Sequence, residues 1–192
     1  MNVKGAENYI TDQLAERLSA NLYYHGVHHV LDVTHTALSI AAQEGITDTE
    51  MLDLLKTAAL YHDCGFMNTY QNHEAEGCGI VRKILPEFGF TPTQIDMICG
   101  MIMATKIPQS PVTHLEQILC DADLDYLGRE DFYQISQTLY SELEQRGLIS
   151  DVLAWNQVQI KFISAHHYWT ETSRNSREEL KQMHLKALEA SV

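Results

Sequence analysis

The sequence has few cysteines, and they lie far apart. Cys64, Cys78, Cys99 and Cys120 form no Cys-x-x-Cys pair. This spacing argues against a thiolate zinc site and against a disulfide framework. Unpaired cysteines are typical of a reducing compartment, and we expect a cytoplasmic location.

Long apolar segments are also missing. No apolar run approaches the roughly 20 residues that span a bilayer, and the first residues lack the basic and then apolar pattern of a secretory signal. The sequence therefore predicts no insertion into a membrane.

Positive charge is scarce as well. The chain has 13 Lys and Arg against 26 Asp and Glu, which gives a net charge of -13. A field of this sign repels nucleic-acid polymers and anionic membrane surfaces, so we expect neither as a partner. A small phosphorylated substrate remains compatible, because a bound cation and a few bases can dominate inside a pocket.

Apolar residues recur at helical spacing almost throughout, and strand-like alternation is scarce. The pattern predicts helices over residues 4–23, 26–44, 49–63, 72–85, 92–105, 113–127, 130–146, 152–167 and 174–190. The turn-rich segment 106–113 is too short to link two independent domains. We therefore expect residues 1–192 to form one compact, all-α helical bundle. Its core would span about 22–170, with the helix 174–190 packed on it or on the second subunit of a homodimer.

The pair His62-Asp63 closes one of the apolar helical runs. Both residues stand where buried apolar side chains are expected. Burying an imidazole beside a carboxylate costs several kcal/mol per ion unless the charge is paired or coordinated, and a divalent cation would offset that cost. A helix-terminal ion pair would also explain a His-Asp dipeptide at this position. The other segments of the chain are therefore needed to distinguish a metal site from an ion pair.

A second candidate segment contains three histidines, His25, His28 and His29. Helical spacing places His29 on the same face as Val33 and Ile40, whereas His28 falls on a polar stripe. The sequence therefore predicts that His29 points into the interior and His28 into solvent. Taken alone, His29 would most simply be a core histidine that is hydrogen-bonded to a neighbour.

The third segment places Asp121, Asp123 and Asp125 in an apolar helical run. Asp121 and Asp125 are four residues apart and share a face, whereas Asp123 is expected to be solvated or locally hydrogen-bonded. The carboxylate of Asp121 or Asp125, together with His29 and the His62-Asp63 pair, would give a mixed nitrogen and oxygen shell around a metal ion. Such a shell suits one divalent ion of manganese, iron, zinc, nickel or magnesium.

In this order, the three segments resemble the HD superfamily of metal-dependent phosphohydrolases, from roughly Leu22 to Thr170. Residues 24–29 look like the first family motif, 58–66 like the second and 119–128 like the last. Residues 72–77 resemble a further His-Glu segment, and 162–170 the tail of small stand-alone bacterial members. The resemblance implies an HD-type bundle with one divalent metal, whose ligands are His29, His62, Asp63 and Asp121.

The resemblance also implies roles for further residues. In the related cyclic-nucleotide phosphodiesterases the first histidine of the first motif protonates the leaving group, a role that falls here to His25, although Gly26 replaces the usual asparagine. Asp63 or Glu74 would orient the attacking water, and His73 is the alternative proton donor.

Phosphate contacts are assigned to bases beside the pocket segments. Lys106 and Arg129 are the candidates, and Asp125 is a further candidate for substrate binding. Members of the HD superfamily that bind two metals carry two more histidines. His73 could be one of them, but Thr105 stands where the other is expected, so a single metal is favoured.

The expected activity is therefore hydrolysis of a phosphomonoester or phosphodiester bond of a small nucleotide-like substrate by metal-activated water. One alternative is a nucleotide-binding or metal-binding regulatory module without turnover, against which the retained ligands argue. A second alternative is di-iron oxygenase chemistry, which needs the histidine pair that Thr105 interrupts.

Overall fold

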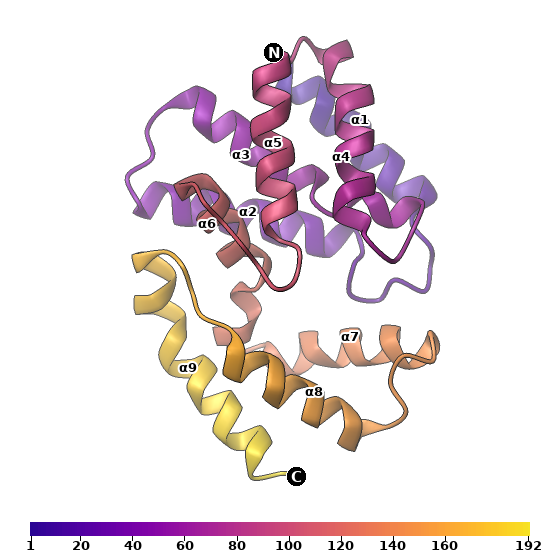
Figure 1. Ribbon diagram of the computed structural model, residues 1–192, viewed down its shortest axis with the longest axis vertical. Helices are drawn as coiled ribbons and strands as arrows, with labels where there is room; N and C mark the ends of the chain where they lie inside the picture. The colour runs from indigo at the N-terminus through magenta and orange to yellow at the C-terminus, as the bar shows by residue number, and fades with distance from the viewer.

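The computed structural model describes all 192 residues, and its secondary structure is entirely helical, which confirms the predicted all-α class (Figure 1). In chain order the elements are α1 (Val3–Arg17), α2 (Val27–Gln43), α3 (Thr49–Tyr61), η1 (Cys64–Met67), α4 (His73–Ile84), η2 (Leu85–Phe88), α5 (Pro92–Ala104), α6 (His114–Asp123), η3 (Asp125–Gly128), α7 (Phe132–Gln145), α8 (Val152–Ala165) and α9 (Glu171–Glu189). The three η elements are short 3-10 helices.

Helix ends follow the capping signals of the sequence. The Asp48 side chain accepts hydrogen bonds from the first-turn amides of α3, and Thr91 forms a capping box with Gln94 at the start of α5. Gly45 follows the end of α2 with a φ of 77°, a left-handed conformation that favours glycine. These local interactions fix where α3 and α5 begin.

Two predicted boundaries differ from the structure. Helix α1 ends at Arg17 rather than near residue 23, so residues 18–26 form a connection. The predicted helix 113–127 is two elements, because Leu124 leaves helical geometry with φ -109° and ψ 16°, and the 3-10 helix η3 follows. Arguments from helical spacing therefore stop at Asp123.

The apolar interior consists of two clusters. The larger one contains 28 buried residues from α1 to α6 and their connections. The smaller one contains eight, namely Tyr24, Leu124, Tyr126, Leu127, Phe132, Ile163, Leu185 and Leu188. Figure 1 shows the corresponding arrangement, with α7, α8 and α9 (orange to yellow) grouped beneath the N-terminal helices. Helix α6 and η3 connect the two groups.

Helix α9 packs on its own chain, against η3, α8 and α2. Its approach to η3 depends on Gly128, where a Cβ atom would lie 2.3 Å from the carbonyl oxygen of Arg177. Any larger residue would push α9 away from η3.

The structure has neither a disulfide nor a helix suited to a bilayer. All four cysteines are buried and free, as their spacing predicted. No helix combines the length and the apolar character needed to cross a membrane.

Candidate metal centre

Packing of α2, α3 and α6 brings three chain segments together. His29 lies in the first turn of α2, His62 directly follows α3, and Asp123 is the last residue of α6. One ligand atom from each lies within 4.8 Å of the others. The Nε2 atom of His29 is 3.2 Å from Oδ1 of Asp123 and 3.4 Å from Nε2 of His62. Three potential metal ligands therefore converge on one point.

Asp63 adds a fourth potential ligand. Its Oδ2 atom lies 3.5 Å from Nε2 of His29 and 3.3 Å from Nε2 of His62. This oxygen is buried and has no hydrogen-bond partner. An unpaired carboxylate oxygen in the interior is costly, and a divalent cation between the four groups would supply the missing partner. Two imidazoles and two carboxylates therefore fit a divalent metal.

The ring of His62 is oriented for this purpose. Its Nδ1 atom lies 2.7 Å from the carbonyl oxygen of Ala59. Because a carbonyl only accepts hydrogen bonds, Nδ1 donates, and in the neutral ring the lone pair is on Nε2. Burial lowers the pKa of His62, but the carboxylates of Asp63 and Asp123 outweigh burial and raise that pKa well above its usual value. A cation must therefore displace a proton, and metal affinity falls as the pH falls.

The facing argument for the first segment is confirmed. His29 is buried together with Val33 and Ile40, whereas His28 is exposed. Thr105, which stands where a second-metal histidine was expected, is buried and lines the cavity beside the metal group. Its hydroxyl donates to the carbonyl oxygen of Ile102.

The structure corrects the choice of aspartate in the third segment. Asp121 is fully buried, but its carboxylate accepts hydrogen bonds from the Trp169 amide and from the amide and hydroxyl of Thr170, at 2.7 to 2.8 Å. Thr170 caps α9, so Asp121 holds the start of that helix. Two residues along a helix turn the side chain by about 200°. Asp123 therefore faces His29, and Asp121 faces the opposite side.

A cavity of about 250 Å³ lies beside the metal group. It is lined by all four side chains to which catalytic roles were assigned, namely His25, Asp63, His73 and Glu74. Thr105 and Asp123 also line it. The Nε2 atom of His73 is 3.4 Å from Oδ1 of Asp63. Phe66 of η1 stacks on both His25 and His73, with ring centroids 4.3 Å and 3.9 Å apart. Phe66 therefore packs against two imidazoles of the cavity lining without lining the cavity itself.

Glu142 of α7 is a site residue that the sequence analysis missed. It is fully buried, and its Oε2 atom accepts from the amides of Tyr24 and His25. Its Oε1 atom lies 2.6 Å from Nδ1 of His25 and accepts from the Tyr70 hydroxyl. The carboxylate therefore fixes the His25 ring and leaves Nε2 as the free nitrogen. A signal existed, because Glu142 falls on the apolar face of Ile135 and Leu139.

Glu142 is also expected to stabilise the fold in a pH-dependent way. Burial raises the pKa of its carboxyl group, but the hydrogen bonds from His25 and from the two amides outweigh burial and lower that pKa from 4.5 to about 2. A lowered pKa contributes stability that is present above pH 4.5 and is lost as the pH falls toward 2.

Glu142→Gln is therefore expected to lower the free energy of unfolding by about 2–3 kcal/mol at pH 7, and by less as the pH falls below 4. Urea unfolding at several pH values measures this. Glu179→Gln, which changes an exposed glutamate of α9, should have an effect under about 0.5 kcal/mol. An equal loss for Glu142→Gln at pH 7 and pH 3 would contradict the assigned ionisation.

The three side chains assigned to substrate binding lie outside the cavity lining. The Nζ atom of Lys106 is exposed and donates to Asn72. Arg129 pairs with Asp32 and Asp131. Asp125 accepts from Arg177 at 2.7 Å. The structure brings none of the three to the cavity lining, and Arg129 and Asp125 instead tie η3 to α2 and α9 through ion pairs.

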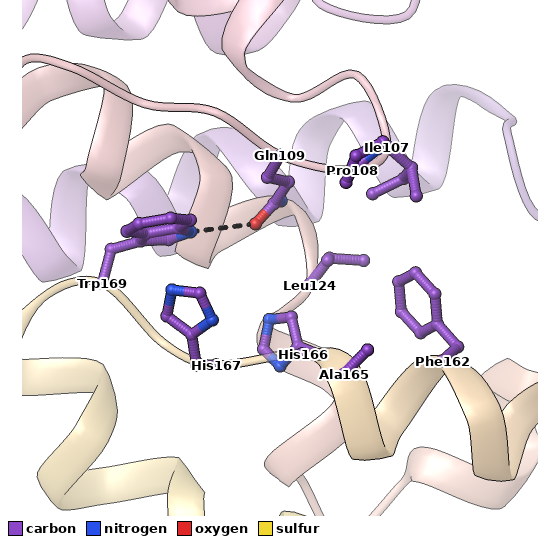
Figure 2. Close-up of a pocket in the computed structure, with 9 residues that line it drawn as sticks. All are labelled: Ile107, Pro108, Gln109, Leu124, Phe162, Ala165, His166, His167 and Trp169. Atoms are coloured by element: carbon purple, nitrogen blue, oxygen red, sulfur yellow. Dashed lines mark hydrogen bonds between the residues drawn. The ribbon is translucent and has the colours of Figure 1, made fainter.

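A second, smaller cavity of about 140 Å³ adjoins the first (Figure 2). The two share Ile107, Leu124 and Phe162. Figure 2 shows Trp169 on the side of this cavity opposite Ile107 and Phe162, where the indole Nε1 donates to Oε1 of Gln109. None of the potential metal ligands lines this cavity.

Three helices that bring two histidines and two aspartates together define an all-α protein with a candidate site for one divalent metal. The sequence model of the HD domain matches residues 26–125, just over half of the chain. The chain therefore belongs to the HD domain family, as its motifs indicated. All four potential ligands fall within the matched residues.

Two solved structures share the fold. One is a predicted HD superfamily hydrolase from an uncultured Thermotogales bacterium, with 21% sequence identity and a TM-score of 0.64 over 95% of this chain and 89% of the other. The second is a protein from Lactobacillus plantarum, with 16% identity and a TM-score of 0.68 over 100% of this chain and 98% of the other. No curated protein matches the sequence.

Proposed function

We propose that this protein is a metal-dependent phosphohydrolase, which cleaves a phosphomonoester or phosphodiester bond of a small nucleotide-like substrate. The observation that carries the proposal is the buried, unpartnered Oδ2 atom of Asp63, which faces the Nε2 atoms of His29 and His62. Membership of the HD domain family, and a structural neighbour described as a predicted HD superfamily hydrolase, support the same class of reaction.

One divalent cation per chain is proposed, with His29, His62, Asp63 and Asp123 as its ligands. Manganese, iron, zinc, nickel and magnesium all suit this donor set. Such an ion would polarise a phosphoryl oxygen and lower the pKa of a bound water toward neutrality. The absence of a histidine at Thr105 favours a single ion.

The other cavity residues supply proton transfer and orientation. His25 is the proposed proton donor to the leaving oxygen, because Glu142 fixes its ring and leaves Nε2 free. Glu74 is buried in the same cavity and is proposed to orient the attacking water by a hydrogen bond. His73, which is held near Asp63, is the alternative donor.

The proposed partner is a small molecule in the cytoplasm. The net charge of -13 disfavours nucleic-acid polymers and anionic membranes. A homodimer remains part of the proposal, and sedimentation would measure it.

The test is hydrolysis of a panel of nucleoside monophosphates and cyclic nucleotides. Phosphate release reports cleavage of the monoesters, and formation of the nucleoside monophosphate reports cleavage of the cyclic diesters, which release no phosphate. The protein would be stripped with a chelator and reloaded with Mn²⁺. We expect turnover with Mn²⁺, none after renewed chelation, and none for His62→Ala. No turnover with any substrate, together with tight nucleotide binding in calorimetry, would show a regulatory module instead.

A further inference from the structure

The cavity beside the metal group has two chemically different ends. At one end lie the carboxylates of Asp63, Glu74 and Asp123 and the imidazoles of His25 and His73. The other end is an apolar wall, formed by Leu139 and Leu143 of α7 and by Trp155, Val158, Phe162 and Ile163 of α8. A ligand held at the metal group by a phosphoryl oxygen therefore places its remaining atoms against hydrocarbon.

The polar side chains at the apolar end are already paired with one another. Gln159 accepts from the Ser136 hydroxyl and donates to Oδ1 of Asn156. The indole Nε1 of Trp155 donates to the same serine oxygen. Hydroxyl groups of a ligand at this end would lose their water and find these partners occupied, which disfavours a strongly polar group.

The charge of the lining limits the number of phosphoryl groups. No Lys or Arg lines the cavity, whereas Asp63, Glu74 and Asp123 do. One divalent cation does not balance these three carboxylates, so a di- or triphosphate would bring further negative charge with no Lys or Arg to receive it. Lys106 and Arg129, the two bases to which phosphate contacts were assigned, are paired elsewhere.

From these observations we infer that the cavity takes a phosphoester with a single phosphoryl group and an apolar organic group, and that the apolar wall selects the organic group. Sugar polyphosphates are poor ligands. The inference rests on the proposed function for the reaction but not for the substrate, because it replaces the nucleotide-like group by an apolar one. The selectivity is a property of binding and can be measured without turnover.

Binding of n-alkylphosphonates to the Mn²⁺-loaded protein tests the inference, because their carbon–phosphorus bond is not hydrolysed. Calorimetry would compare ethyl-, butyl- and hexylphosphonate with inorganic triphosphate. Each added methylene that reaches the wall should lower Kd by about fourfold. Triphosphate should bind more weakly than hexylphosphonate. Equal affinities along the alkyl series, or tighter binding of triphosphate, would overturn the inference.

A matched pair of variants locates the effect. Val158→Asp places a carboxylate on the apolar wall, and Val152→Asp makes the same change on α8 outside the cavity lining. Val158→Asp should weaken hexylphosphonate at least tenfold and ethylphosphonate less than twofold. Val152→Asp should change neither. Equal effects of the two substitutions would show that the wall does not hold the alkyl group.

Phosphate release from ethyl, butyl and hexyl phosphate separates this inference from the proposed function. If neither these esters nor any nucleotide of the panel is hydrolysed but the phosphonates still bind in the predicted order, the proposed function fails and the inferred selectivity holds. If all are hydrolysed with equal kcat/KM and the phosphonates bind equally, the proposed function holds and the selectivity fails.

Discussion

Asp123→Asn is expected to weaken Mn²⁺ binding by more than about 100-fold, because loss of a direct ligand should exceed the 10–100-fold effect of losing an outer-shell partner. Asparagine keeps the size of the side chain but removes the charge that lies 3.2 Å from Nε2 of His29. Hydrolysis should be lost with the metal. Calorimetric titration of chelator-stripped protein with Mn²⁺ measures the affinity.

Asp121→Asn is the matched control, since it makes the same change two residues earlier. The metal affinity should stay within about threefold, but unfolding should become easier by about 2 kcal/mol or more, because a buried carboxylate that accepts three hydrogen bonds is lost. His28→Ala should alter neither property, since that side chain is exposed. If Asp121→Asn abolished metal binding and Asp123→Asn did not, the structural assignment would be reversed.

His25→Asn is expected to lower kcat by about 10²- to 10⁴-fold, which is the usual contribution of a general acid. The asparagine amide can still donate to Glu142, so the buried carboxylate keeps a partner and the fold is preserved. Mn²⁺ affinity should not change, because His25 is not one of the metal-ligand group. Steady-state kinetics at saturating Mn²⁺ measure kcat and KM separately.

His73→Asn distinguishes the two candidate donors. Both rings stack on Phe66 and line the same cavity, so an effect of cavity shape alone would appear in both variants. If only His73→Asn lowers kcat, the donor is His73. If both variants raise KM with kcat unchanged, the two histidines bind substrate and transfer no proton.

The sequence analysis succeeded where helical periodicity decides the direction of a side chain. His29 and His28 are adjacent, yet one is buried and the other exposed, because apolar neighbours at helical spacing define the inner face of α2. The same reasoning placed the His62-Asp63 pair at the end of an apolar helix. The predicted helix starts at residues 49 and 92 also match α3 and α5, where Asp48 and Thr91 provide caps.

Periodicity failed where the helix stops. The expectation that Asp121 and Asp125 share a face requires a helix through residue 127, but α6 ends at Asp123 and η3 begins at Asp125. The choice between Asp121 and Asp123 depends on which neighbouring segment each one faces, and those segments are distant in sequence. The sequence likewise could not show that Arg129 pairs with Asp32, because that partner comes from another helix.

Glu142 shows how long-range contacts escape a local pattern. It lies 117 residues from His25, and only the docking of α7 beside the α2 entry brings the two together. A glutamate on an apolar helical face was a usable signal, because a buried carboxylate needs partners. The identity of the partner, however, is a property of the folded chain.

The separation of the metal-ligand group along the chain has a thermodynamic consequence. His29 and Asp123 are 94 residues apart, so an unfolded molecule cannot present all four donors at once. A cation that binds only the native form, and whose free concentration is 100 times its Kd, adds about 2.7 kcal/mol to the free energy of unfolding. Heat resistance of this protein should therefore follow the free concentration of the ion, and a melting curve would report the metal supply.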